Sequence, residues 1–235
     1  MSFSEADLAS MTVPAWARAK EAIADGRLDD AVALIDEGAQ RVRGLQIYSI
    51  EWITSLLSFV GRELGEEAVE RALRTSGDEF IRARREPADA PAWETLPARV
   101  RAKVIARAMV ANGGECQVAE DDEKIVLSFR CGSGGRLIDE GRYDVDGGPF
   151  LSLQDAAPRT FGRTSFPVYC AHCSVNNEMQ PVEWGGTPTS IEHPPEHAGE
   201  PCVHHVYKDV TAIPDSAYVR IGASPTRGER PPSDA

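Results

Sequence analysis

The chain has 235 residues, 42% of them hydrophobic, which is enough for one compact domain or two small ones. Its 25 basic and 37 acidic residues give a net charge of −12. Such a surface repels phosphate backbones, and because no stripe of Lys or Arg is present, we expect no nucleic-acid partner. The N-terminus has no basic leader and no apolar core, so no signal peptide is expected.

The first half of the sequence predicts helices. Apolar residues recur at helical spacing over 14–24, 28–64, 66–85 and 98–111. Prolines mark 86–97 as a linker, and Asn112-Gly113-Gly114 ends the last of these helices. The middle of the 28–64 helix is apolar on nearly all sides, so we expect neighbouring helices to cover it. Its stretch 45–60 is too short to span a bilayer, and it fits a homodimer interface as well as burial within one chain.

The second half predicts strands, placed over 115–120, 124–130, 187–192 and 202–208. The first two flank a polar turn and form a hairpin. Residues 132–165 are rich in Gly, Asp, Arg and Pro and indicate a long loop with one short strand. A helix is predicted from Ser174, as its N-cap, to Glu183, and a last helical piece begins at Pro214.

The expected fold class is therefore α+β, with an N-terminal helical half packed on a small antiparallel sheet that carries a cysteine-rich zinc site. The expected divisions are a helical region 1–97, an α+β zinc-binding region 98–222 and a disordered tail 223–235. Without a leader or a membrane span, we expect a bacterial-type soluble protein of the cytoplasm. In that reducing compartment, cysteines serve metal or redox chemistry more often than disulfides.

Four of the five cysteines stand in surroundings typical of metal ligands. Cys170 and Cys173 form a Cys-x-x-Cys pair between an extended run and a helix, Cys131 heads a glycine-rich turn, and Cys202 opens a strand. Two thiols two residues apart, with two more supplied from elsewhere, can give Zn²⁺ its four tetrahedral ligands. The alternative is that these are scattered core thiols, which is what we expect of Cys116.

A redox function is the second alternative for the Cys170–Cys173 pair. A helix that begins at such a pair lowers the pKa of the first thiol, as in thioredoxin-type oxidoreductases. No strand–helix–strand unit leads into the motif here, which favours the metal.

Three residues near these cysteines are candidates for catalysis. On a strand, His204 points to the same side as Cys202, so it can bind the metal or act as a general base. Glu178 follows the Cys-x-x-Cys pair on the predicted helix and can return toward the site for acid–base work. His172 lies inside the pair itself and is the third candidate. The alternative for His204 is that it only donates a hydrogen bond to the site, and the alternative for Glu178 is a solvated helix face.

The sequence from Gly199 to Tyr207 closes a segment in which a cysteine-bearing turn, a helix, a strand and a Gly/Pro loop follow one another. In element order over 98–221, this segment resembles the 4-vinyl reductase-type domain and is similar to the L-2-amino-thiazoline-4-carboxylic acid hydrolase-like family. The resemblance implies an α+β domain with a small-molecule pocket between helices and an antiparallel sheet. That hydrolase family opens a small ring containing sulfur and nitrogen, whereas reductase-type domains often bind ligands. The loop headed by Cys131 and the His204-His205 pair depart from both patterns.

Two classes of function follow from these residues. The first is a zinc-dependent hydrolase or lyase for a small metabolite, of the sulfur- and nitrogen-containing kind that the resemblance implies, in which His204 or Glu178 moves protons. The second is a ligand-binding or partner-binding protein in which four thiolates and Zn²⁺ only hold the sheet together. Three protein ligands plus water would indicate catalysis, and four thiolates would indicate a structural site. We expect an enzyme whose partner is a small molecule.

Overall fold

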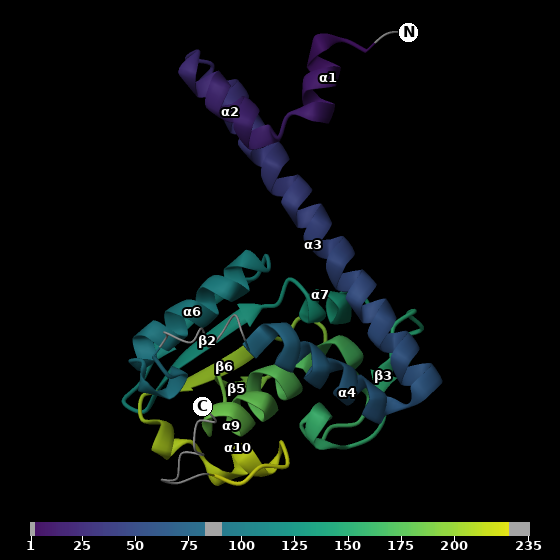
Figure 1. Ribbon diagram of the computed structural model, residues 1–235, viewed down its shortest axis with the longest axis vertical. Coiled ribbons are helices and arrows are strands. Elements are labelled where there is room, and N and C mark those ends of the chain that lie inside the picture. The colour runs from purple at the N-terminus through teal and green to yellow at the C-terminus, as the bar shows by residue number, and fades with distance from the viewer. Residues whose placement is uncertain (1–2, 83–90, 226–235) are drawn as a thin grey trace. The chain divides into compact units, whose positions relative to one another are not determined.

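The computed structural model describes residues 3–82 and 91–225 of the chain (Figure 1). It divides into two compact units, Met1–Glu51 and Trp52–Ala235. Helices combine with a four-stranded antiparallel sheet, which confirms the α+β class. None of the helices in the described ranges has both the length and the hydropathy that a bilayer crossing needs.

The first unit is helical throughout. It contains α1 (Glu5–Thr12), α2 (Ala15–Ala24) and the beginning of α3 (Leu28–Leu64), whose bounds match the predicted helix. Small side chains make the contact between α2 and α3, and four alanines there are buried: Ala15, Ala19, Ala22 and Ala31. An ion pair of 2.7 Å between Arg18 and Glu37 flanks this contact.

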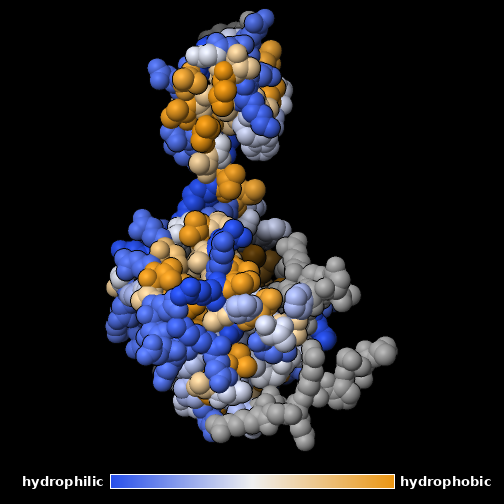
Figure 2. Space-filling model, turned by 90° about the vertical axis from the view of Figure 1, so that its left-hand side faces the viewer, coloured by the Kyte–Doolittle hydropathy of each residue, from blue (hydrophilic) through white to orange (hydrophobic). Residues whose placement is uncertain are grey.

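The expectation that neighbouring helices cover the middle of α3 is wrong for much of its surface. Ile50 and Leu57 are buried, but Leu45, Tyr48 and Phe59 are 66%, 64% and 61% exposed. In the first unit the reason is that alanines make the contact between α2 and α3, so only one narrow stripe of α3 is covered there and its large apolar side chains point away from it. Figure 2 shows hydrophobic residues gathered on the surface of this helical part. On the second unit it shows smaller hydrophobic patches between hydrophilic areas.

The second unit is built on the sheet. Its strands are β1 (Glu115–Glu120), β2 (Lys124–Arg130), β5 (Ile191–His193) and β6 (Cys202–Tyr207), in the order β1-β2-β6-β5. The predicted hairpin of β1 and β2 is confirmed, and β5 is shorter and later than predicted. Helix α6 (Ala98–Ala111), as predicted, packs on one face of the sheet, where Ile105 and Met109 meet alternate residues of β2 and β6 (Figure 1).

The long loop expected over 132–165 is interrupted by helix α7 (Gly134–Asp139), which was not predicted. Its one expected short strand is present as β3 (Ser152–Leu153), which pairs with β4 (Phe166–Pro167). The physical reason is that apolar side chains are spaced through this polar sequence, and each is buried with an exposed fraction of 6% or less: Leu137, Tyr143, Phe150 and Leu153.

The predicted helix over 66–85 is α4 (Glu66–Ser76), which continues as a π-helical turn, Gly77–Ile81. The end of that prediction and part of the 86–97 linker lie outside the described residues, and the linker's remainder holds a 3₁₀ turn, Trp93–Thr95. The last helical piece is confirmed as α10 (Asp215–Val219), which begins after Pro214. The predicted tail lies outside the described residues from 226 onward.

A continuous helical segment, which we call the helical run, covers 168–185. It comprises a 3₁₀ turn (Val168–Cys170), α8 (Ala171–Ser174), a π-helical turn (Val175–Met179) and α9 (Gln180–Gly185). Ser174 is therefore not an N-cap but lies inside the run. It is buried, and its hydroxyl donates to the carbonyls of Arg159 and Ala171.

A proline ties the helical run to the sheet. Pro181 has no N–H to donate to the carbonyl of Asn177 four residues earlier, so that carbonyl is left for another donor. The backbone N–H of Thr189 takes this place at 2.8 Å, just before β5 begins. The hydrogen bond fixes the start of β5 against the π-helical turn, a local geometry that is frequent at functional sites.

Candidate functional site

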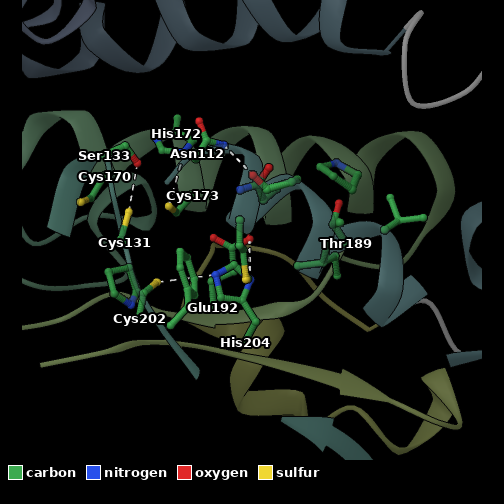
Figure 3. Close-up of a pocket in the computed structure, with 18 of the residues that line it drawn as sticks. Asn112, Cys131, Ser133, Cys170, His172, Cys173, Thr189, Glu192, Cys202 and His204 are labelled. Carbon is green, nitrogen blue, oxygen red and sulfur yellow. Dashed lines mark hydrogen bonds and ion pairs between the residues drawn. The ribbon is translucent and has the colours of Figure 1, made fainter. Parts of the chain in front are cut away.

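A cavity of about 540 Å³ opens in the second unit between α6, the helical run and the sheet. Its size is in the range of pockets that hold drug-sized ligands. Apolar and aromatic side chains form much of its wall, among them Trp93, Ile105, Met109, Phe129 and Tyr169. Four of the five cysteines, two histidines and Glu192 also face it, as the close-up of Figure 3 shows.

The sheet brings three polar side chains to the floor of this cavity. Cys202 and His204 lie two residues apart on β6 and therefore point to the same face, as the alternation predicted. Glu192 on β5 is the cross-strand partner of His204, so it joins them on that face. The three side chains are 4%, 6% and 2% exposed at the level of the whole residue.

These side chains form a chain of polar contacts. His204 Nε2 lies 3.5 Å from Cys202 Sγ, and His204 Nδ1 lies 3.0 Å from the Oγ of Ser190. Ser190 in turn donates to Glu192 Oε1 at 3.4 Å, which is also the direct distance from His204 Nδ1 to that oxygen. The network assigns the imidazole tautomer: Nδ1–H donates to Ser190, and Nε2 is free to accept from the thiol.

Burial keeps this histidine and this thiol neutral at rest. Desolvation lowers the pKa of His204, while the charge of Glu192 opposes that shift. Desolvation, followed by the charge of Glu192, raises the pKa of Cys202 well above its usual value. A neutral thiol beside a neutral imidazole is a resting nucleophile–base pair, in which the base takes the proton only when an electrophile is attacked.

The structure places Glu178 behind the sheet floor and not in the cavity wall. Its Oε1 accepts from the backbone N–H of Glu192 and from the guanidinium of Arg220, each at 2.5 Å. Desolvation raises the pKa of this fully buried carboxyl to about 8, against the opposing effect of Arg220. Glu178 therefore holds β5 in position and does not touch the cavity that a substrate would occupy.

The other three cavity thiols, Cys131, Cys170 and Cys173, form what we call the thiol cluster. Cys131 contacts the hydroxyl of Ser133 at 3.0 Å. A Cβ atom placed on Gly134 would stand only 2.8 Å from Cys170 Sγ, so glycine at the start of α7 is what lets this thiol pack there. The cluster thus joins the turn after β2 to the helical run.

The electrostatics of the thiol cluster disfavour a redox pair. Desolvation, followed by the charge of Cys131, raises the pKa of Cys170 far above its usual value, and desolvation does the same for Cys173. Redox-active thiols of the Cys-x-x-Cys type need the opposite shift, toward the thiolate. All five cysteines of the chain are free thiols.

The fit of this site to a metal ion can be tested from its side chains. Within the part of the chain that the structure describes, no three His, Cys, Asp or Glu side chains are arranged to hold one ion. The four predicted zinc ligands, Cys131, Cys170, Cys173 and Cys202, do face the same cavity. Zinc at these thiols therefore stays a prediction, and we derive no chemical step through it.

His172 also faces the cavity, from the helical run. Its Nδ1 lies 2.6 Å from the carbonyl oxygen of Tyr169, and its Nε2 lies 3.7 Å from Cys173 Sγ. Both contacts lie within the helical run, so they hold the ring of His172 against its own segment of the chain. Glu192 and Ser190 were not predicted as site residues from the sequence, although both lie within the strand predicted over 187–192.

Comparisons of the chain with protein-family models, with curated proteins and with solved structures find no match. The site must therefore be interpreted from its own chemistry.

Proposed function

We propose that the protein is an enzyme that uses the thiol of Cys202 as a nucleophile on a small, largely apolar molecule. His204 is the general base, and Glu192 orients it through Ser190. The reaction class is hydrolysis of an acyl-type bond, in which a thiol attacks a carbon that is doubly bonded to oxygen or nitrogen. The single observation that carries the proposal is that Cys202 Sγ, His204 and Glu192 follow one another in hydrogen-bonding sequence at the floor of one cavity.

The steps follow from this geometry. Cys202 gives its proton to His204 Nε2 as its sulfur bonds to the electrophilic carbon, and the π electron pair of that carbon moves to its oxygen or nitrogen. When the intermediate collapses, the leaving group takes the proton from His204. Water, deprotonated by the same imidazole, then cleaves the thioester (or the thioimidate, for a C=N carbon), and the imidazolium returns the proton to the departing sulfur of Cys202. The net change is the addition of one water across the bond that breaks.

The surroundings support this role for the imidazole. Burial holds it neutral, and therefore competent to accept a proton, over the ordinary pH range. Glu192 then stabilises the imidazolium that forms during attack, because a carboxylate near a buried cation is worth far more than one in water. Met109 and Phe129 add apolar surface to the cavity wall, and Cys202 is only 4% exposed, so few water molecules reach the attacking sulfur.

An acyl-transfer burst tests the proposal. With p-nitrophenyl acetate as the probe, we expect a stoichiometric burst of p-nitrophenol and an acetyl group on the Cys202 peptide in mass spectrometry. The Cys202→Ala variant should lose both, whereas Cys116→Ala removes a thiol outside the cavity and should keep both. A burst that persists in Cys202→Ala would overturn the assignment of the nucleophile.

A zinc-dependent hydrolase or lyase is the second candidate, and one observation favours it. Cys131, Cys170, Cys173 and Cys202 face one cavity closely enough that their charges affect one another's pKa. If these thiols close around an ion, mass spectrometry of the native protein will find one zinc per chain. That zinc should be lost in Cys170→Ser and kept in Cys116→Ser, while a protein without stoichiometric zinc would remove this candidate.

A further inference from the structure

We infer that the ligand of this cavity carries a hydrogen-bond donor, best as a protonated amine, that binds Glu192 Oε2, and that it carries no carboxylate or phosphate. The inference rests on the proposed function in one respect, that the ligand lies beside Cys202. It goes further by naming the polar group that the ligand must present. Three features of the cavity support it.

The first feature is an acceptor without a donor. Glu192 is 2% exposed and faces the cavity. Its Oε1 accepts from Ser190 and lies 3.4 Å from His204 Nδ1, whereas its Oε2 has no hydrogen-bond partner among the described residues. A buried carboxylate oxygen without a donor is costly, so a ligand that supplies an N–H there gains a hydrogen bond that the protein's own groups do not make.

The second feature is the charge of the wall. Among the described residues that face the cavity, the charged ones are Glu94 and Glu192, and none is Lys or Arg. Among the described residues, this wall therefore offers no Lys or Arg side chain to pair with a ligand carboxylate or phosphate. An anion would be placed beside Glu192 in surroundings where like charges repel strongly.

The third feature is that the neighbouring polar side chains do not donate to Oε2. Cys173 and Cys202 offer only S–H groups, which are weak hydrogen-bond donors. The Nδ1–H of His204 is already directed at Ser190. The remaining wall, with Trp93, Ile105 and Met109, offers apolar contact for the body of a ligand.

Three indoles that differ only in their end group test the inference. Tryptamine is a cation, tryptophol is neutral and indole-3-propionate is an anion, and all three fit a cavity of about 540 Å³. By titration calorimetry, we expect tryptamine to bind at least about tenfold more tightly than indole-3-propionate, with tryptophol between them. Equal affinities, a preference for the anion, or no binding by any of the three would overturn the inference.

Two variants distinguish an effect of Glu192 itself on binding from an effect of the protein's overall negative charge. Glu192→Gln should abolish the advantage of tryptamine over tryptophol, while Glu67→Gln, which removes an exposed charge on α4, should preserve it. An advantage that survives in folded Glu192→Gln would contradict the inference. If Glu192→Gln does not fold, the ranking of the three probes on the wild-type protein still decides the question.

These results are distinguishable from failure of the proposed function. The binding ranking requires no reaction, and the p-nitrophenyl acetate burst requires no amine. Loss of the ranking with a burst that depends on Cys202 would remove only the inference. The expected ranking without such a burst would remove only the assigned nucleophile.

Discussion

Glu192 and His204 lie directly opposite each other on the antiparallel strands β5 and β6, and Glu192 Oε1 stands 3.4 Å from His204 Nδ1. This pairing depends on strand register, because a slip of one residue would turn either side chain to the other face of the sheet. The register is fixed from behind by Glu178, which accepts the N–H of Glu192, and from the side by the Asn177–Thr189 hydrogen bond. Contacts to the backbone of Glu192 and Thr189 thus hold Glu192 in line with His204 and Cys202.

Ser190 lies between His204 and Glu192, so removal of its hydroxyl should weaken the chain of polar contacts that leads to Cys202. In Ser190→Ala, His204 Nδ1 loses its partner at 3.0 Å and keeps only the longer contact with Glu192. We expect acylation of Cys202 by p-nitrophenyl acetate to slow by about tenfold or more, since small losses of orientation are costly in rate. Ser128→Ala, on the other face of the sheet, should change the rate less than about twofold. Equal rates in the two variants would contradict the bridging role.

The packing of the thiol cluster predicts a specific clash. A side chain at Gly134 would meet Cys170 Sγ at 2.8 Å and Tyr169 Cδ1 at 3.1 Å. We expect Gly134→Ala to lower the free energy of unfolding by about 1–3 kcal/mol, measured by urea denaturation. At Gly44, in helix α3, a Cβ meets nothing within 4 Å, so Gly44→Ala should be neutral or stabilising.

A double-mutant cycle makes this prediction specific to Cys170. If the thiol is the clashing group, Cys170→Ala should recover part of the loss caused by Gly134→Ala, giving a coupling energy above about 0.5 kcal/mol. Strictly additive losses would show that the thiol does not lie against the start of α7.

Glu178 predicts a pH dependence of stability. Its pKa in the folded protein is about 8, against a usual value of 4.5, because the carboxyl is buried. Between these two values the folded state keeps a proton that the unfolded state releases, so raising the pH lowers the free energy of unfolding. From about pH 5 to about pH 8, the wild type should lose at least about 1.4 kcal/mol more than Glu178→Gln, which cannot titrate.

The control for this experiment is a carboxylate nearby in sequence. Glu183 lies on the same helical run, half exposed, and pairs with Arg74 at 2.8 Å. Glu183→Gln should change stability by less than about 1 kcal/mol and leave the pH dependence of the wild type intact. Parallel pH curves for the wild type and Glu178→Gln would mean that Glu178 is not a buried acid.

Much of the secondary structure could be predicted, because local patterns determine it. The periodicity of apolar residues gave the bounds of α3 and α6, and alternation with a polar turn gave β1 and β2. Alternation also placed Cys202 and His204 on one face. The helical structure within 132–165 was not predicted, because isolated apolar residues such as Leu137 and Leu153 show neither helical nor strand periodicity.

The position of Glu192 could have been found by one more step. Two predicted strands joined by a short polar loop form an antiparallel pair, and a register error of two residues leaves every side chain on its correct face. Glu192 would then have been assigned to the face of Cys202. The position of Glu178 could not have been found, because it depends on how the helical run packs behind β5.

Alkylation of Cys202 by iodoacetamide, followed at the Cys202 peptide by mass spectrometry, tests the central proposal most directly. His204 lies 3.5 Å from the sulfur, whereas its neighbour His205 faces the other side of the sheet, beside His193. We expect His204→Ala to slow alkylation by about a hundredfold, the usual contribution of a general base, and His205→Ala to slow it less than about twofold. Equal effects of the two substitutions would show that His204 does not activate Cys202 and would contradict the proposed enzyme.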